Sequence, residues 1–340
     1  MFVNNAYGID LGTGNIKISS HNGKKTINER NMIAIKDDLH IIALGDKAYE
    51  IYEKAPKNIK VSCPMVGGVI GNIGNMEILL YGLTKKLSFF SARRSNLYIV
   101  VPTDVSEVEK RAFFAVVKGS IMKAHKVKIV EKALADAAYL DIDFHSERGT
   151  MIMNMGADTT EMSIISGGRI IISKTLKFGG NRLDERICTI VRRRYNLSIG
   201  MKTGELLKNE LAYVCNGEQK NLKVYGVNIV TGLPRTAEIS SAVVHEAILG
   251  TIDLIIDSAK SLLERTPPEL VNDIMNEGIY ITGGVSKIPN LPYYMKLETG
   301  FAINTTTDPV MSTIRGLLKI MNDKEYRTLA YSIKDMAVHI

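Results

Sequence analysis

The chain has 340 residues, of which 45% are hydrophobic and 23% are charged. This length and mixture suit two α/β domains and exclude a disordered chain. No run approaches the ~20 apolar residues of a membrane-spanning helix, and the first ten residues lack the blocks of a signal peptide, so we expect a cytosolic protein. The net charge of +7 favours an anionic partner. Three widely separated cysteines exclude a C-x-x-C zinc site.

The first chemical motif lies near the N-terminus. Residues 7–18 contain an apolar strand, a turn of sequence Gly12-Thr13-Gly14-Asn15 and a second β-rich run. Because β-formers alternate on both sides of the turn, we predict a hairpin and not a Rossmann or Walker loop. Glycines let backbone N–H groups approach a polyphosphate, and Asp10 is placed to hold the water shell of Mg²⁺. The alternative is an ordinary hairpin.

The next elements are a helix and a second hairpin. A capping box formed by Ser106 and Glu109 predicts a helix through Val117. Residues 151–166 then repeat the first design, with a turn of sequence Gly156-Ala157-Asp158-Thr159-Thr160. We expect this turn to close on the same phosphates from the opposite domain, with its hydroxyls and N–H groups as further donors.

Two further elements follow. Residues 241–263 carry apolar side chains at helical spacing, and Pro267-Pro268 stops this predicted helix. Residues 279–286 form a strand that delivers Gly283-Gly284 to a helix start, where a base or ribose can approach bare backbone; a simple strand-to-helix turn is the alternative. Hairpins followed by helices, occurring twice, predict two α/β domains with a cleft between them.

In this order, the three Gly-containing elements resemble the actin, Hsp70 and sugar-kinase superfamily, and nearly the whole chain resembles the MreB family of bacterial actins. The matching segments are Gly8–Gly14, Pro64-Met65, Gly68–Ile70, Val101-Pro102, Glu107–Ala112, Thr159–Glu161, Arg194–Leu197, Ile199-Gly200, Val230–Pro234 and Glu264–Leu270. The resemblance implies an α/β actin-like ATPase fold of two duplicated domains, each with a small subdomain, and ATP with Mg²⁺ in the cleft.

The resemblance also implies domain limits and site residues. We expect domain I at residues 1–145 plus 315–340, with a small subdomain at about 33–65, and domain II at residues 146–314, with a small subdomain at about 181–244.

Motif matching also assigns the site residues. The first phosphate loop is Thr13, Gly14 and Asn15, with Lys17 as a further candidate. The second phosphate loop is Gly156, Ala157, Asp158 and Thr159. The segment from Glu205 to Lys208 matches the stretch beside base and ribose. The adenosine loop is Gly283, Gly284, Val285 and Ser286, with Val285 where a third glycine is usual. Asp10 and Asn154 would hold the metal through water.

Two positions depart from the family pattern. The family activates its hydrolytic water with a glutamate in a Glu-Glu-Pro run, and the corresponding run here is Glu131-Lys132-Ala133. A charged lysine cannot accept a proton at pH 7. Asn154 stands where the family has aspartate, so the Mg²⁺ pocket loses one negative charge. We therefore predict weak or absent ATP hydrolysis.

Several alternatives stay open. A one-residue shift would make Glu131 the base, with Lys132 paired to Asp136 four positions on. Lys132 would otherwise reach the γ-phosphate and strengthen ATP binding. Asp158 places a carboxylate beside the phosphates unless it faces away or assists the metal. The rival functions are a fully active ATPase filament protein that uses Glu131, a chaperone-type or kinase-type ATPase, and a nucleotide-independent scaffold.

A basic and aromatic segment suggests a membrane contact. Phe89 and Phe90 lie between Lys85-Lys86 and Arg93-Arg94, which suits insertion into an anionic membrane interface. The resemblance implies a membrane-inserting loop at this position; the alternative is a pair of core residues at a helix end.

The expected partners follow from these motifs. We expect other copies of the chain in a filament, paralogous actin-like subunits and the inner face of the cell membrane. Nucleic acid is not expected, because the Arg192-Arg193-Arg194 run has no neighbouring aromatic cluster. The sequence thus predicts a cytoplasmic, peripheral, ATP-binding cytoskeletal protein whose membrane-associated filaments govern cell shape or movement.

Overall fold

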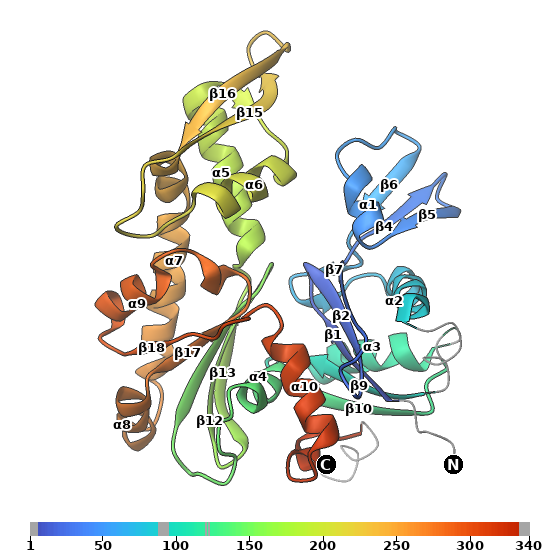
Figure 1. The fold of residues 1–340 in the computed structure, drawn as a ribbon, viewed down its shortest axis with the longest axis vertical. Coiled ribbons are helices and arrows are strands. Elements are labelled where there is room, and N and C mark those ends of the chain that lie inside the picture. The colour runs from blue at the N-terminus through green and yellow to red at the C-terminus, as the bar shows by residue number, and fades with distance from the viewer. Residues whose placement is uncertain (1–5, 88–94, 120, 122, 333–340) are drawn as a thin grey trace. The chain divides into compact units, whose positions relative to one another are not determined.

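The computed structural model describes residues 6–87, 95–119, 121 and 123–332 (Figure 1). Contacts within the chain divide it into two compact units. Unit 1 comprises Met1–Glu147, Ile165–Thr175 and Val310–Ile340, and unit 2 comprises Arg148–Ile164 and Leu176–Pro309. The domain and subdomain limits expected from the sequence stay predictions.

Unit 1 contains a five-stranded sheet in the order β10-β9-β1-β2-β3. Its strands are β1 (Ala6–Leu11), β2 (Asn15–Ser20), β3 (Thr26–Arg30), β9 (Asn96–Val101) and β10 (Lys126–Glu131). The predicted first hairpin is confirmed, because β1 pairs with β2 in antiparallel orientation and the turn leads into a strand. Strands β1, β9 and β10 run parallel, so their carboxyl ends share one edge of the sheet.

Helices cover both faces of this sheet. The apolar core packs beneath α2 (Ile73–Leu87) and α3 (Glu107–Lys118). The predicted capping box is confirmed at the start of α3, where the side chain of Ser106 accepts a hydrogen bond from the Glu109 N–H and the Glu109 carboxylate accepts one from the Ser106 N–H. On the other face, α10 (Ser312–Asn322) packs against α4 (Lys132–Tyr139). A short helix, η2 (Tyr326–Leu329), follows α10.

Unit 1 also contains smaller elements. A three-stranded sheet in the order β5-β4-β6 contains β4 (Ile33–Lys36), β5 (His40–Leu44) and β6 (Ile59–Ser62), with α1 (Asp46–Ile51) beside it. A two-stranded sheet contains β7 (Met65–Val66) and β8 (Val69–Ile70). Phe89 and Phe90 lie outside the described residues. Within the part of the chain that the structure describes, no helix is long and apolar enough to cross a membrane.

The second five-stranded sheet has the order β13-β12-β11-β17-β18. Its strands are β11 (Thr150–Met155), β12 (Thr160–Ser166), β13 (Arg169–Leu176), β17 (Ile279–Thr282) and β18 (Ile303–Asn304). Strands β11 and β12 are hydrogen-bonded neighbours joined by a short turn, as the sequence predicts. Strand β17 runs parallel to β11, so the segments that follow these two strands leave the sheet at one edge.

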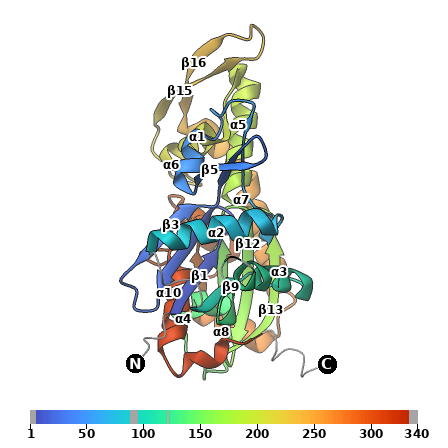
Figure 2. The ribbon, with the colours of Figure 1, turned by 90° about the vertical axis from the view of Figure 1, so that its right-hand side faces the viewer.

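The remaining elements, all of which belong to unit 2, are mainly helices. They are α5 (Gly180–Tyr195), α6 (Met201–Leu211), α7 (Ser241–Leu263), α8 (Pro268–Glu277), η1 (Val285–Lys287) and α9 (Leu291–Thr299). The predicted helix 241–263 is confirmed as α7. A small sheet contains β14 (Leu197–Ser198), β15 (Asn221–Asn228) and β16 (Pro234–Ser240). The β15–β16 hairpin lies at the opposite end of unit 2 from α8 (Figures 1 and 2).

Candidate functional site

The first candidate phosphate turn connects β1 to β2 in unit 1. A Cβ atom at Gly12 would lie 2.7 Å from the backbone oxygen of Asn15, which favours glycine there. Asn31 holds the turn from one side, since its Nδ2 donates to the Gly12 oxygen (2.9 Å) and its N–H donates to the Gly14 oxygen (3.0 Å). The C=O and N–H of a trans peptide point in opposite directions, so the N–H groups of Thr13 and Asn15 point away from Asn31. Outward N–H groups of this kind suit a phosphate.

A buried ion pair lies beside this turn. Asp10 and Lys17 are register partners across the hairpin, and the Lys17 Nζ lies 2.9 Å from the Asp10 Oδ2. Both residues are buried, on the sheet face opposite to Ile9 and Leu11, which belong to the core. An ammonium for phosphate oxygens and a carboxylate for the water shell of Mg²⁺ are thus present at the same turn.

The register of β10 places the Glu131 side chain on the core face. Glu131 pairs with Val101, whereas Asp10 pairs with Val100, so the side chains of Glu131 and Asp10 point to opposite faces of the sheet. The Glu131 carboxylate accepts a hydrogen bond from the Tyr331 hydroxyl (2.6 Å), in the segment that follows η2.

A second group also contacts Glu131. The Lys110 Nζ, on α3, lies 3.7 Å from the Glu131 Oε1. Burial and, after it, the negative charge of Glu131 raise the pKa of the Tyr331 hydroxyl well above its usual value, so this hydroxyl stays a donor at neutral pH. The Glu131 carboxylate is therefore already bound by a hydroxyl and an ammonium.

Lys132 is the first residue of α4, directly after Glu131. Asp136, the alternative partner of Lys132 in the sequence, is fully buried and accepts hydrogen bonds from the hydroxyls of Ser312 (2.9 Å) and Thr313 (2.7 Å) on α10. These bonds fix Asp136 as a packing contact between α4 and α10.

The second candidate phosphate turn is held by the start of α5 in unit 2. The Gly156 N–H closes the turn on the Thr159 oxygen (2.8 Å). The N–H groups of Gly180 and Asn181 donate to the oxygens of Gly156 (3.0 Å) and Ala157 (2.8 Å). By the same peptide geometry, the N–H groups of Ala157 and Asp158 point away from the helix.

Close backbone contacts support this second turn. A Cβ atom at Gly179 would lie 2.5 Å from the Ala157 oxygen, so glycine permits this approach. The Asp158 carboxylate accepts a hydrogen bond from the Asn181 side chain (2.6 Å). This bond directs one carboxylate oxygen of Asp158 to α5.

The candidate adenosine loop leaves the sheet beside the second turn. Asn154 and Thr282 are register partners, so the turn after β11 and the loop after β17 begin side by side. Gly283 has a φ of 83°, and a Cβ atom there would lie 2.6 Å from the carbonyl carbon of Met155. The Ser286 hydroxyl donates to the Gly283 oxygen (2.7 Å) and closes the loop. The expected helix start is the short helix η1.

Lys208 on α6 joins the same group of residues. Its Nζ lies 2.8 Å from the Asp184 carboxylate and donates to the Gly180 oxygen (3.1 Å). A Cβ atom at Gly180 would lie 3.6 Å from the Val285 side chain, so Val285 lies beside the start of α5. Glu205 precedes Lys208 by almost one turn of α6. Unit 2 thus brings together the second turn, the adenosine loop and Lys208.

Some residues of these arrangements were not predicted from the sequence. Gly179-Gly180 before a helical pattern is a signal that could have been found, because glycine pairs permit close backbone contact. Asn31 and Asn181 carry no local signal, since their partners are fixed by the fold.

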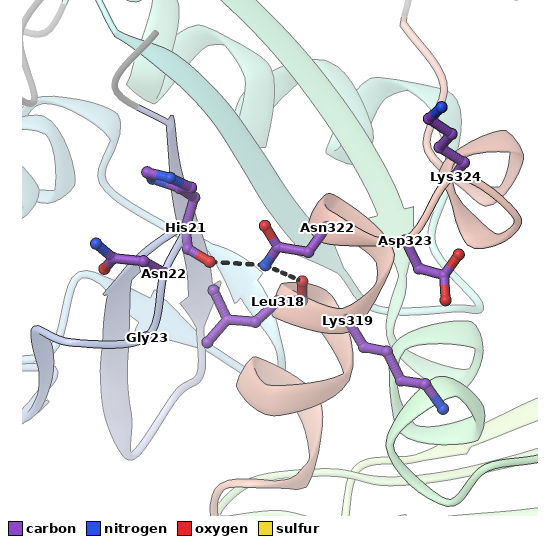
Figure 3. A pocket seen from close by; sticks show the side chains of 8 residues that line it. All are labelled: His21, Asn22, Gly23, Leu318, Lys319, Asn322, Asp323 and Lys324. Carbon is purple, nitrogen blue, oxygen red and sulfur yellow. Dashed lines mark hydrogen bonds between the residues drawn. The ribbon is translucent and has the colours of Figure 1, made fainter. Parts of the chain in front are cut away.

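A separate surface pocket lies in unit 1, between the turn after β2 and the end of α10 (Figure 3). The Asn322 side chain bridges its two walls by donating to the backbone oxygens of His21 (2.7 Å) and Leu318 (2.8 Å). The pocket is lined by His21, Asn22, Gly23, Leu318, Lys319, Asn322, Asp323 and Lys324. His21 follows the far end of β2, roughly 20 Å along the strand from Asn15, so this pocket is not part of the phosphate turn.

The chain is similar to known proteins over most of its length. The model of the MreB/Mbl protein family matches residues 4–328. The cell shape-determining protein MreB of Escherichia coli (strain K12) is 31% identical over 92% of each chain. The cell shape-determining protein Mbl of Bacillus subtilis (strain 168) is 32% identical over 89% of this chain and 91% of Mbl.

Solved structures agree with this assignment. MreB5 of Spiroplasma citri bound to ADP is 31% identical, with a TM-score of 0.90 over 96% of this chain and 98% of that chain. The same protein bound to AMPPNP also has a TM-score of 0.90, at 30% identity. The MamK double helical filament shares the fold at 21% identity, with a TM-score of 0.79 over 94% of this chain and 99% of that chain. The predicted actin-like fold is confirmed, and the chain belongs to the MreB/Mbl family.

Proposed function

We propose that this protein binds ATP with Mg²⁺, assembles with other copies into filaments at the inner face of the cell membrane, and hydrolyses ATP weakly or not at all. The observation that carries ATP binding is the pair of glycine turns whose carbonyl groups are held from behind. Outward N–H groups, Lys17 and Asp10 fit a polyphosphate and its metal ion. The ADP and AMPPNP complexes of Spiroplasma citri MreB5 support the same ligand class.

The site residues have separate roles in this proposal. Thr13, Gly14, Asn15 and Lys17, together with the turn Gly156–Thr159, hold phosphate groups. The loop Gly283–Ser286 and the α6 residues Glu205 and Lys208 lie beside the adenosine. The Lys208 ammonium already forms an ion pair with Asp184, so we propose that Lys208 stabilises this loop instead of binding the nucleotide.

Weak hydrolysis follows from the groups near the end of β10. A base must accept a proton from water, and the charged Lys132 cannot do so. Glu131 is the other candidate, but its carboxylate points to the core face and accepts a hydrogen bond from Tyr331. Asn154 supplies no charge to the metal's water shell. These features favour a nucleotide-binding subunit over an efficient ATPase.

Exposed apolar side chains support self-assembly. On the β15–β16 hairpin, Tyr225, Val230 and Leu233 are 73%, 77% and 65% exposed. At the opposite end of unit 2, Met275 on α8 is 64% exposed (Figure 1). The exposed apolar side chains of the hairpin suit a contact with another copy of the chain, as a head-to-tail filament requires. A weakly hydrolysing subunit would also copolymerise with active paralogous subunits; cosedimentation with such a paralogue tests this.

The cellular location and role are further parts of the proposal. The net charge of +7 favours an anionic surface, and the Phe89-Phe90 pair between basic residues suits a membrane interface. The MreB and Mbl relatives are named cell shape-determining proteins, which supports a role in cell shape or movement.

Phosphate release under polymerising conditions tests the hydrolytic part. We expect little phosphate from the wild type with ATP and Mg²⁺, and a gain with Lys132→Glu, because the variant restores a carboxylate at the start of α4. Lys126→Glu makes the same charge change at an exposed position on the other end of β10 and is the control. A wild-type rate that Lys132→Glu does not exceed would show that Lys132 is not the defect, and Glu131→Gln would then test Glu131 as the base.

A further inference from the structure

Asn31 is a buried amide directly behind the first phosphate turn. It follows β3, its side chain is fully buried, and it makes two hydrogen bonds to the turn, through Nδ2 to the Gly12 oxygen (2.9 Å) and through its N–H to the Gly14 oxygen (3.0 Å). These two oxygens belong to the peptides whose N–H groups are those of Thr13 and Asn15. Asn31 therefore controls the direction of both N–H groups.

The carbonyl groups of the two phosphate turns accept hydrogen bonds from different kinds of donor. In unit 2, the carbonyl groups of Gly156 and Ala157 accept hydrogen bonds from the backbone at the start of α5. At the first turn, the donors to the Gly12 and Gly14 oxygens both belong to Asn31, which follows β3, and not to the start of a helix. One of these two donors is the Asn31 side chain.

The amide oxygen of Asn31, Oδ1, indicates which part of the side chain stabilises the turn. Asn31 Oδ1 is buried and has no hydrogen-bond partner among the described residues. A buried unpaired oxygen destabilises the folded state, and an apolar side chain of similar size would avoid that cost. The amide therefore contributes through its donor to Gly12.

We propose that Asn31 is a positioning residue for nucleotide phosphates, and this inference rests on the proposed ATP binding. It acts through the turn and not by touching the ligand, because its donors point to the turn's carbonyl groups. Its effect should scale with the number of phosphates on the ligand. Adenosine, which has none, does not use the turn.

The test compares Asn31→Leu with Asn96→Leu. Leucine is close in size to asparagine and removes both the donor and the unpaired oxygen. Asn96 has an unpaired buried Oδ1 as well, and it begins β9, at the other end of this sheet from the first phosphate turn. The measurements are the Kd for ATP and for adenosine, and hydrogen exchange of residues 11–16 without nucleotide.

We expect Asn31→Leu to raise the Kd for ATP roughly two- to tenfold, the effect of one lost hydrogen bond, with an unchanged Kd for adenosine. Hydrogen exchange of residues 11–16 should be faster in this variant and unchanged in Asn96→Leu. If Asn31→Leu does not fold, Asn31→Ala is measured with the same expectations.

Two results would overturn the inference alone: a wild-type Kd for ATP in the variant, or equal weakening of ATP and adenosine. Absence of ATP binding by the wild type would overturn the proposed function and this inference with it.

Discussion

Gly283 provides a sharp test of the site in unit 2. Its φ of 83° lies in the left-handed region, and a Cβ atom would lie 2.6 Å and 2.8 Å from the carbonyl carbon and nitrogen of Met155. A side chain at positive φ costs about 1–2 kcal/mol, and overpacking against rigid backbone costs about 1–3 kcal/mol more. We expect Gly283→Ala to lower the free energy of unfolding by about 2–5 kcal/mol.

Gly284→Ala is the control for this change. Gly284 has a φ of −68°, and no atom lies within 4 Å of a Cβ built there. Thermal unfolding followed by circular dichroism should show a Tm for Gly283→Ala that is lower by roughly 4–20 °C, because about 2–4 °C is lost per kcal/mol in a unit of this size. The Tm of Gly284→Ala should equal that of the wild type.

ATP binding by the two variants distinguishes the packing of the loop from its direct contact with the nucleotide. Gly283→Ala should also weaken ATP binding, since it displaces the adenosine loop from the second turn. Gly284→Ala should weaken ATP binding without loss of stability if the base or ribose approaches this glycine. A wild-type Tm for Gly283→Ala would mean that the loop is not packed against Met155.

Two further predictions concern stability. Ser106→Ala removes the side-chain half of the α3 capping box and should lower the free energy of unfolding by about 1 kcal/mol in urea titrations; no change would mean that the cap does not stabilise α3. Burial and, after it, the hydrogen bond to Asp253 (2.7 Å) raise the pKa of the Tyr294 hydroxyl in the folded state. Above about pH 10 the unfolded state loses this proton first, so stability should fall as the pH rises further, and less so in Tyr294→Phe; identical pH profiles between pH 9 and 11 would contradict this.

Local features of the fold were predictable from the sequence. Alternating β-formers around Gly12–Asn15 predicted the first hairpin, and the Ser106-Glu109 pair predicted the start of α3. Apolar spacing and Pro267-Pro268 predicted α7 and its end. Each of these signals involves residues close together in the chain, where backbone geometry and hydrogen bonding are set by neighbours.

The contacts that shape the candidate site were not predictable in this way. The bond from Tyr331 to Glu131 joins residues 200 positions apart, and the face on which Glu131 lies depends on the register between β9 and β10. The support of Gly12 by Asn31 likewise arises only after β3 pairs with β2. The loop after Gly284 begins the short helix η1 and not a long helix, because Ile288 and the residues after it leave the helical path before α9 begins.

Sedimentation with ATP and Mg²⁺, with phosphate measured in the same samples, tests whether this protein assembles on ATP without efficient hydrolysis. We predict that purified protein pellets with ATP or AMPPNP but not without nucleotide, and that far less than one phosphate is released per subunit while the pellet forms. A pellet that does not depend on nucleotide, or rapid release of phosphate in step with ATP supply, would contradict it.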